Sequence, residues 1–121
     1  MSKRVLVVED TEDNRHIIRD LLSSAGYEMI EAVTGAEGVE MARTHVPDLI
    51  LMDMQMPVLD GYEATRRIKA EPALAHIPVI AVTSYALSGD EEKTRAAGCD
   101  GYVAKPFSPR QLLAKVREFL D

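Results

Sequence analysis

The chain has 121 residues, 46% of them hydrophobic and 28% charged, and its net charge is −6 at pH 7. This length and composition fit one compact globular domain rather than a disordered chain, and the negative charge disfavours binding to nucleic acid or to an anionic membrane surface. The single cysteine, Cys99, allows no intrachain disulfide, and no apolar run approaches the roughly 20 residues that span a membrane. We therefore expect a cytoplasmic protein with one domain over residues 1–121 and no output domain.

Short runs rich in β-branched residues alternate with segments of helical period, which predicts βαβ units and a parallel sheet. In chain order, the expected elements are strand 4–9, helix 12–25, strand 27–33, helix 36–45, strand 48–53, helix 59–70, strand 78–83, helix 89–97, strand 101–104 and helix 109–120. Glycines just past the first and fourth helices fit left-handed helix caps. The chain is thus predicted to be an α/β protein with five strands and five helices.

The apolar pattern also separates central from peripheral elements. The first, third and fourth strands are almost continuously apolar, as expected for strands covered on both faces, whereas Glu28 and Glu31 interrupt the second strand and indicate a half-exposed edge. The fourth helix offers only Ala96 and Ala97 to the core, with Leu87 just before it. Because so little apolar area holds it, we expect the fourth helix to be the most easily displaced.

Acidic residues stand at the ends of two predicted central strands. Glu9 and Asp10 end the first strand, and Asp53 ends the third. If these strands are neighbours, three carboxylates meet at one edge, where they repel one another unless a cation compensates them. Mg²⁺ is a hard cation that binds carboxylate oxygens together with phosphate and water. The acid cluster therefore predicts a magnesium site.

A hydroxyl and an ammonium group follow at the same edge. Thr83 ends the fourth strand and Lys105 follows the fifth. A hydroxyl donor and a cation that face a metal-bound carboxylate make a cradle for a phosphoryl group. This combination suits phosphoryl transfer onto Asp53, in which positioning and charge neutralisation do most of the catalytic work.

Four motifs at four strand ends give the chain its resemblance to a known family. They are Val7-Val8-Glu9-Asp10, Asp53-Met54-Gln55-Met56-Pro57 with Asp60-Gly61, Val82-Thr83-Ser84, and Tyr102-Val103-Ala104-Lys105-Pro106-Phe107. In this order and spacing, the chain resembles the receiver domain of two-component response regulators, and it is most similar to stand-alone members that regulate the cell cycle. The resemblance implies a flavodoxin-like, doubly wound parallel sheet with strand order 2-1-3-4-5.

The resemblance also implies a role for each matching residue. Asp53 would accept a phosphoryl group from a sensor histidine kinase or a histidine phosphotransferase, so the protein would be a signalling phosphoacceptor rather than an enzyme. Asp10 and Asp53 would bind Mg²⁺ through their side chains, Gln55 through its backbone carbonyl and Glu9 through water. Thr83 and Lys105 would hold the phosphoryl oxygens. A cis peptide bond is implied between Lys105 and Pro106.

Receivers of this family pass the signal to a surface. A phosphoryl group at Asp53 would attract Thr83, and Tyr102 would fill the space that Thr83 leaves, together with a movement of the loop 84–88. The fourth helix, the last strand and the last helix would then bind an unknown downstream protein. On the first helix, Arg15, Ile18, Arg19 and Leu22 could contact a kinase helical bundle, although Ile18 and Leu22 could equally belong to the core.

Three other protein classes share part of this pattern. A phosphatase of the haloacid dehalogenase type also uses an aspartate nucleophile, but it needs a second acid two residues later, where this chain has Gln55. A flavodoxin-like cofactor-binding protein would need a glycine-rich phosphate loop after the first strand, where this chain has acids. The third alternative, a receiver piece from a hybrid sensor kinase or a larger regulator, stays open at the level of sequence.

Overall fold

The computed structural model describes residues 2–56, 58–83 and 90–121. Within these ranges the chain forms a five-stranded sheet with strands β1 (Arg4–Val8), β2 (Glu28–Ala32), β3 (Leu49–Asp53), β4 (Val79–Thr83) and β5 (Gly101–Ala104). The helices are α1 (Glu12–Ser24), α2 (Gly35–His45), α3 (Gly61–Ala70), α4 (Asp90–Ala97) and α5 (Pro109–Leu120). All strand pairs are parallel and the order is β2-β1-β3-β4-β5, which confirms the predicted fold class.

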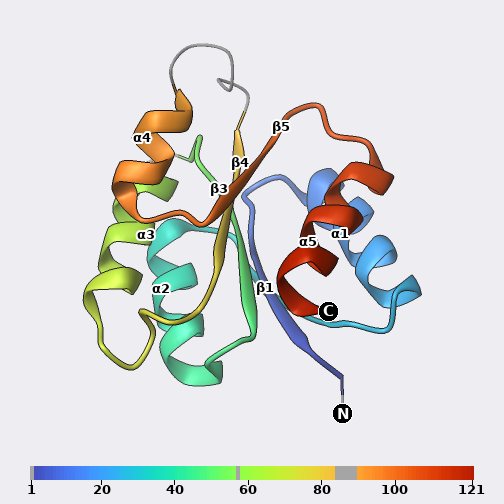
Figure 1. The fold of residues 1–121 in the computed structure, drawn as a ribbon, viewed down its shortest axis with the longest axis horizontal. Coiled ribbons are helices and arrows are strands. Elements are labelled where there is room, and N and C mark those ends of the chain that lie inside the picture. The colour runs from blue at the N-terminus through green and yellow to red at the C-terminus, as the bar shows by residue number, and fades with distance from the viewer. Residues whose placement is uncertain (1, 57, 84–89) are drawn as a thin grey trace.

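The sheet lies between two layers of helices, with α2, α3 and α4 on one face and α1 and α5 on the other (Figure 1). Side chains of successive strand residues point to opposite faces of the sheet. Each central strand therefore contributes residues to two hydrophobic clusters, one on each face. Leu6 and Ile50 belong to the cluster under α2 and α3, whereas Val5 and Leu49 belong to the cluster under α1 and α5. Burial on both faces explains why these strands have continuous apolar sequences.

The registers of the strands bring their carboxyl ends to a common edge. Val8 pairs with Met52, Asp53 pairs with Val82, and Thr83 pairs with Ala104. Every residue of β3 and β4 is buried, whereas β2 is mostly half-buried or exposed, so the predicted centre and edge of the sheet are confirmed. This edge is where the loops to the following helices begin and where the predicted site residues meet.

Two helix boundaries have clear local causes. The prediction placed the start of α3 at Leu59, but the helix begins at Gly61, because the side chain of Asp60 accepts a hydrogen bond from the backbone N–H of Glu63 and caps the helix there. At the end of α1, Gly26 has φ +87°, a left-handed conformation that glycine adopts without steric penalty, as predicted.

The packing of α4 differs from the prediction. Ala97 is buried as expected, but Ala96 is exposed and Thr94 is buried in its place. A further contact comes from Lys93, whose Nζ lies 4.3 Å from the centre of the Tyr62 ring on α3. A cation over an aromatic ring is attracted by the electron-rich face of that ring. Leu87 and the rest of the loop 84–88 lie outside the described residues.

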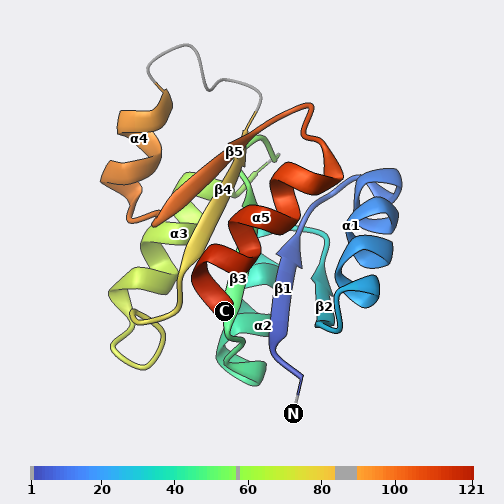
Figure 2. The same ribbon diagram turned by 45° about the vertical axis from the view of Figure 1, so that its right-hand side comes forward.

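Both ends of the chain lie at the edge of the sheet opposite the predicted site (Figures 1 and 2). β1 begins at that edge, and α5 returns to it from the carboxyl ends of the strands. The Tyr27 hydroxyl donates a hydrogen bond of 3.1 Å to the side chain of the last residue, Asp121. Among the described helices, none combines the length and apolar character that a membrane crossing requires.

Candidate phosphoryl-acceptor site

Three acidic residues meet at the carboxyl edge of the sheet. Asp53 is the last residue of β3, and Glu9 and Asp10 follow the neighbouring strand β1. One carboxylate oxygen from each of the three lies within 4.8 Å of the other two. Glu9 and Asp53 are each only 2% exposed, whereas Asp10 is exposed. The prediction that these acids share one edge is therefore confirmed.

Lys105, which follows the outer strand β5 at the same carboxyl edge, contacts both buried acids. Its Nζ lies 3.0 Å from Asp53 Oδ1 and 3.4 Å from Glu9 Oε1. The same Asp53 oxygen accepts a hydrogen bond of 3.0 Å from the backbone N–H of Gln55. Lys105 follows β5, and its peptide bond to Pro106 is cis, as the family resemblance implied.

The electrostatics of the site follow from burial and from an excess of acids. Burial raises the pKa of the Glu9 carboxyl, and the charge of Asp53 raises it further, although the backbone N–H of Thr11 and the ammonium of Lys105 oppose this. Burial alone would lower the pKa of Lys105, but its hydrogen bond and charge interaction with Asp53 outweigh that effect and raise it. Three carboxylates thus face one ammonium, which favours binding of a further cation.

Thr83 is fully buried at the end of β4, and its hydroxyl is already engaged. Its Oγ1 accepts a hydrogen bond of 2.8 Å from the side-chain amide of Gln55. This contact of the Gln55 side chain was not predicted, and the role of its backbone carbonyl as a metal ligand stays a prediction. Since an amide side chain two residues after Asp53 can reach across the strand ends, its residue type was the signal for this contact.

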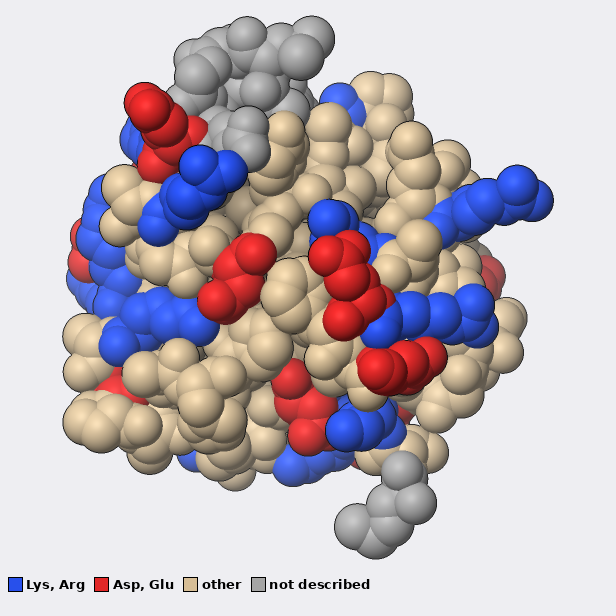
Figure 3. All heavy atoms as spheres, viewed as in Figure 1, with Lys and Arg blue, Asp and Glu red and all other residues tan. Residues whose placement is uncertain are grey.

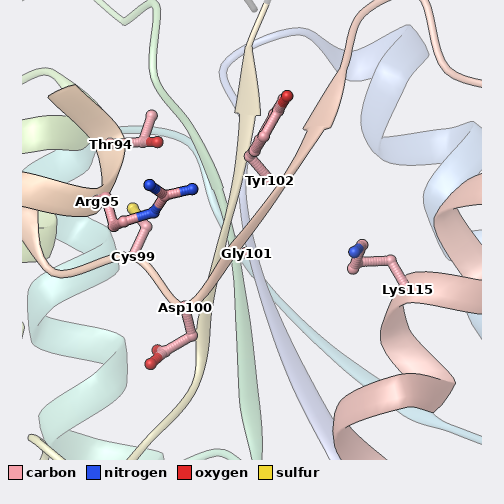
Figure 4. A pocket seen from close by; sticks show the side chains of 7 residues that line it. All are labelled: Thr94, Arg95, Cys99, Asp100, Gly101, Tyr102 and Lys115. Carbon is pink, nitrogen blue, oxygen red and sulfur yellow. The ribbon is translucent and has the colours of Figure 1, made fainter. Parts of the chain in front are cut away.

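Tyr102 lies on β5, half-buried against the hydrophobic cluster under α2 and α3. It lines a pocket of about 350 Å³ together with Arg95 of α4 and Lys115 of α5. Figure 4 shows that the Tyr102 hydroxyl points toward the carboxyl end of β5. Its place between α4 and α5 fits the predicted readout role, whereas the loop 84–88, predicted to move with it, lies outside the described residues.

Arg15 on α1 contacts the site in a way that was not predicted from the sequence. Its guanidinium donates a hydrogen bond of 2.8 Å to the backbone carbonyl of Glu9. Ile18 and Leu22 are buried, so the core alternative holds for them. Arg15 is buried as well, whereas Arg19 is half-buried, and its contact with a kinase stays a prediction. An arginine one and a half helical turns after the acid pair was the available signal.

Known proteins resemble this chain over nearly its whole length. The model of the response regulator receiver domain matches residues 5–117. The polar-differentiation response regulator DivK of Brucella ovis is 46% identical over 120 residues, which cover 99% of this chain and 98% of DivK. The receiver domain of the sensor histidine kinase PA1611 from Pseudomonas aeruginosa was solved with a magnesium ion in its active-site cleft. It is 38% identical to this chain, with a TM-score of 0.92, and the match covers 99% of this chain and 98% of the PA1611 chain. The chemotaxis protein CheY4 of Vibrio cholerae is 28% identical with a TM-score of 0.93, covering 98% of this chain and 99% of its own.

Proposed function

Since the chain belongs to the response regulator receiver domain family, we propose that it accepts a phosphoryl group on Asp53 from a phosphohistidine and changes a protein-binding surface in response. The phosphohistidine would belong to a sensor histidine kinase or a histidine phosphotransferase. The observation that carries the proposal is the buried Asp53 carboxylate, which is held by Lys105 at 3.0 Å beside two further acids. Buried ionisable groups that lie close to other charged groups are typical of functional sites. Asp53 lies in such surroundings, beside one lysine and two further acids.

The donor set at this edge fits Mg²⁺. Glu9, Asp10 and Asp53 offer only carboxylate oxygens, all within 4.8 Å of one another, and Mg²⁺ prefers oxygen ligands, with water and phosphate completing its octahedron. Asp10 and Asp53 would be direct ligands, Glu9 would act through water, and Gln55 would add its backbone carbonyl. The bound ion would neutralise charge on the transferring phosphoryl oxygens.

Asp53, Lys105 and Gln55 would each have a separate role in phosphoryl transfer. A carboxylate oxygen of Asp53 attacks phosphorus, the new O–P bond forms as the P–N bond to the donor imidazole breaks, and that imidazole departs. Lys105 now binds Asp53 Oδ1 and would shift its donation to a phosphoryl oxygen. The backbone N–H of Gln55 fixes the same carboxylate, so that Asp53 is oriented before the donor arrives.

The response would begin at Thr83. A phosphoryl group adds a charge of roughly −1.5 to −2 and three acceptor oxygens, so the Thr83 hydroxyl would leave Gln55 and donate to it. Tyr102 would then move inward and alter the surface of α4, β5 and α5. Acidic and basic side chains are interspersed over this face (Figure 3), a pattern suited to a selective protein partner.

Two settings for this receiver have support. Likeness to DivK over 98% of that protein's length favours a response regulator with a role in polar differentiation, as the name of that relative states. Likeness to the receiver of the kinase PA1611 at 38% identity favours a receiver that works within a phosphorelay of a larger kinase. Both settings require the same chemistry at Asp53.

The test is phosphorylation by a small donor. The protein is incubated with Mg²⁺ and acetyl phosphate, and its intact mass is measured. We expect wild type to gain one phosphoryl group and Asp53→Asn to gain none. Asp60→Asn is the matched control, because Asp60 is an exposed acid that caps α3 and asparagine caps equally well. Absence of the mass gain in wild type, or its persistence in Asp53→Asn, contradicts the proposal.

A further inference from the structure

Arg15 carries a buried positive charge that contacts both the backbone of the acid pair and two other acidic side chains. Only 9% of the residue is exposed. One terminal nitrogen donates to the Glu9 carbonyl at 2.8 Å, the other contacts the Glu12 carboxylate, and Nε lies 3.3 Å from Glu31 Oε1 on β2. Because a buried guanidinium is expensive to desolvate unless its donors are paired, this arrangement holds Arg15 in one orientation.

The bond to the Glu9 carbonyl acts on the acid pair through the backbone. The carbonyl of Glu9 and the N–H of Asp10 belong to one planar peptide unit, so fixing the carbonyl fixes the direction in which Asp10 leaves the strand. The N–H of Glu9 is held at the same time by the Ala32 carbonyl at 3.0 Å. Since Asp10 is exposed, its backbone is the part of it that the fold can control.

The shape of arginine matters here as much as its charge. A guanidinium presents donors in a fixed planar fork, and Arg15 uses three of its nitrogens on three different partners. Lysine offers a single ammonium on a flexible stem and lacks this fork. The nearby Glu12 and Glu31 carboxylates balance the charge of Arg15, so its influence on the acids is geometric rather than a simple attraction.

Arg19, one turn further along α1, provides an internal comparison. It donates to Glu31 at 2.6 and 3.1 Å, lies 3.7 Å from Glu12, and is 3.5 Å from a ring nitrogen of His16. Arg19 thus shares two acidic partners with Arg15, but its described contacts stop short of the Glu9 backbone. Replacing each arginine in turn can therefore distinguish the effect of the ion pairs with Glu12 and Glu31 from the effect of the hydrogen bond to the Glu9 carbonyl.

We infer that Arg15 is a positioning residue for metal binding: its hydrogen bond to the Glu9 carbonyl orients the Glu9–Asp10 peptide and so sets the affinity of the acid cluster for Mg²⁺. This inference rests on the function proposed above. Residues that orient metal ligands without touching the metal typically change its affinity by about 10- to 100-fold when they are replaced.

The test compares Arg15→Met with Arg19→Met in the full chain. The Mg²⁺ dissociation constant is measured by isothermal titration calorimetry, and folding is checked by urea unfolding in the presence of a chelator. We expect Arg15→Met to weaken Mg²⁺ binding about 10-fold or more, whereas Arg19→Met retains the wild-type affinity. Phosphorylation of Arg15→Met by acetyl phosphate is slow at low Mg²⁺ and recovers at saturating Mg²⁺, which a general loss of structure would not produce.

Each result supports or overturns the inference. If Arg15→Met does not fold, Arg15→Lys takes its place, because it keeps the charge and most of the stem but loses the fork. A folded Arg15 variant with wild-type Mg²⁺ affinity overturns the inference, and so does an equal weakening in Arg19→Met, since the network rather than the Glu9 bond would then be responsible. A wild-type protein that binds no Mg²⁺ instead contradicts the proposed function.

Discussion

Glu31 shows how one side chain on the edge strand contributes to the surroundings of the site. It receives two hydrogen bonds from Arg19 and lies 3.3 Å from Nε of Arg15. The hydrogen bond from Arg19 is the largest cause that lowers the pKa of the Glu31 carboxyl below its ordinary value, and burial opposes it. Because 35% of the Glu31 side chain is exposed, solvent screens these charges and limits their contribution to stability.

A depressed pKa has a definite sign in the pH dependence of stability. The Glu31 ion pair stabilises the fold above the ordinary value of 4.5 and loses this contribution as the pH falls through the lower pKa of the folded state. We expect Glu31→Gln to reduce the free energy of unfolding by about 0.5 kcal/mol at neutral pH, with the difference from wild type shrinking in acid. Urea unfolding across this pH range measures it.

The control for this prediction is a double-mutant cycle with Arg19→Met. In the Arg19→Met background, Glu31→Gln should show a much weaker pH dependence, because the main cause of the depressed pKa is gone. A difference between wild type and Glu31→Gln that stays constant from neutral to acidic pH would refute the interpretation.

At the scale of elements, the start of α3 is pressed against the end of β3. A methyl group at Gly61 would lie 2.3 Å from the backbone oxygen of Asp53 and 2.8 Å from the Cα of Met54. Both neighbours are backbone atoms and cannot rotate away as a side chain can. The absence of a side chain at Gly61 therefore lets the start of the helix lie directly behind Asp53, the proposed phosphoryl acceptor.

We expect Gly61→Ala to lower the free energy of unfolding by about 3 kcal/mol, the upper range for overpacking a rigid site, and to slow phosphorylation of Asp53. Gly26→Ala is the control, since a methyl group there meets nothing within 4 Å but the residue has φ +87°. Its loss should be only about 1 kcal/mol, from the left-handed backbone alone. Urea unfolding would go against this account if Gly61→Ala were as stable as wild type.

The elements also show where sequence reasoning reaches its limit. Continuous apolar runs identified β3 and β4 because burial on both faces leaves no polar alternation, whereas the strand order came from the family resemblance. The buried face of the fourth helix was predicted only in part, because buried Thr94 is a polar residue that no hydrophobic pattern selects. The position of Arg15 depends on Glu31, which reaches it from another element, and pairings between distant segments leave no periodic signal.

At the scale of the whole molecule, the unbalanced acids at the sheet edge oppose folding until a cation compensates them. The chain as a whole is also acidic, with a net charge of −6. A ligand that binds only the folded state raises stability in proportion to the logarithm of its concentration. Metal binding and folding should therefore be linked in this protein.

We expect Mg²⁺ at about 100-fold above its Kd to add about 2.7 kcal/mol to the free energy of unfolding. For a chain of this length the corresponding rise in Tm is roughly 10 °C, and a chelator should reverse it. Calorimetry of wild type, Asp53→Asn and the control Asp60→Asn measures the effect. If Mg²⁺ left the Tm of wild type unchanged, or raised the Tm of Asp53→Asn by the same amount, the assignment of the acids as ligands would be contradicted.

The position of the two chain ends has a practical consequence. Because both ends lie at the edge of the sheet away from Glu9, Asp10 and Asp53 (Figure 2), an affinity tag, a fluorescent reporter or another folded module can be joined to either end without covering the acids. The acid cluster and the points of attachment thus lie at opposite edges of the sheet, so a fused module can be exchanged without changing the surroundings of the acids.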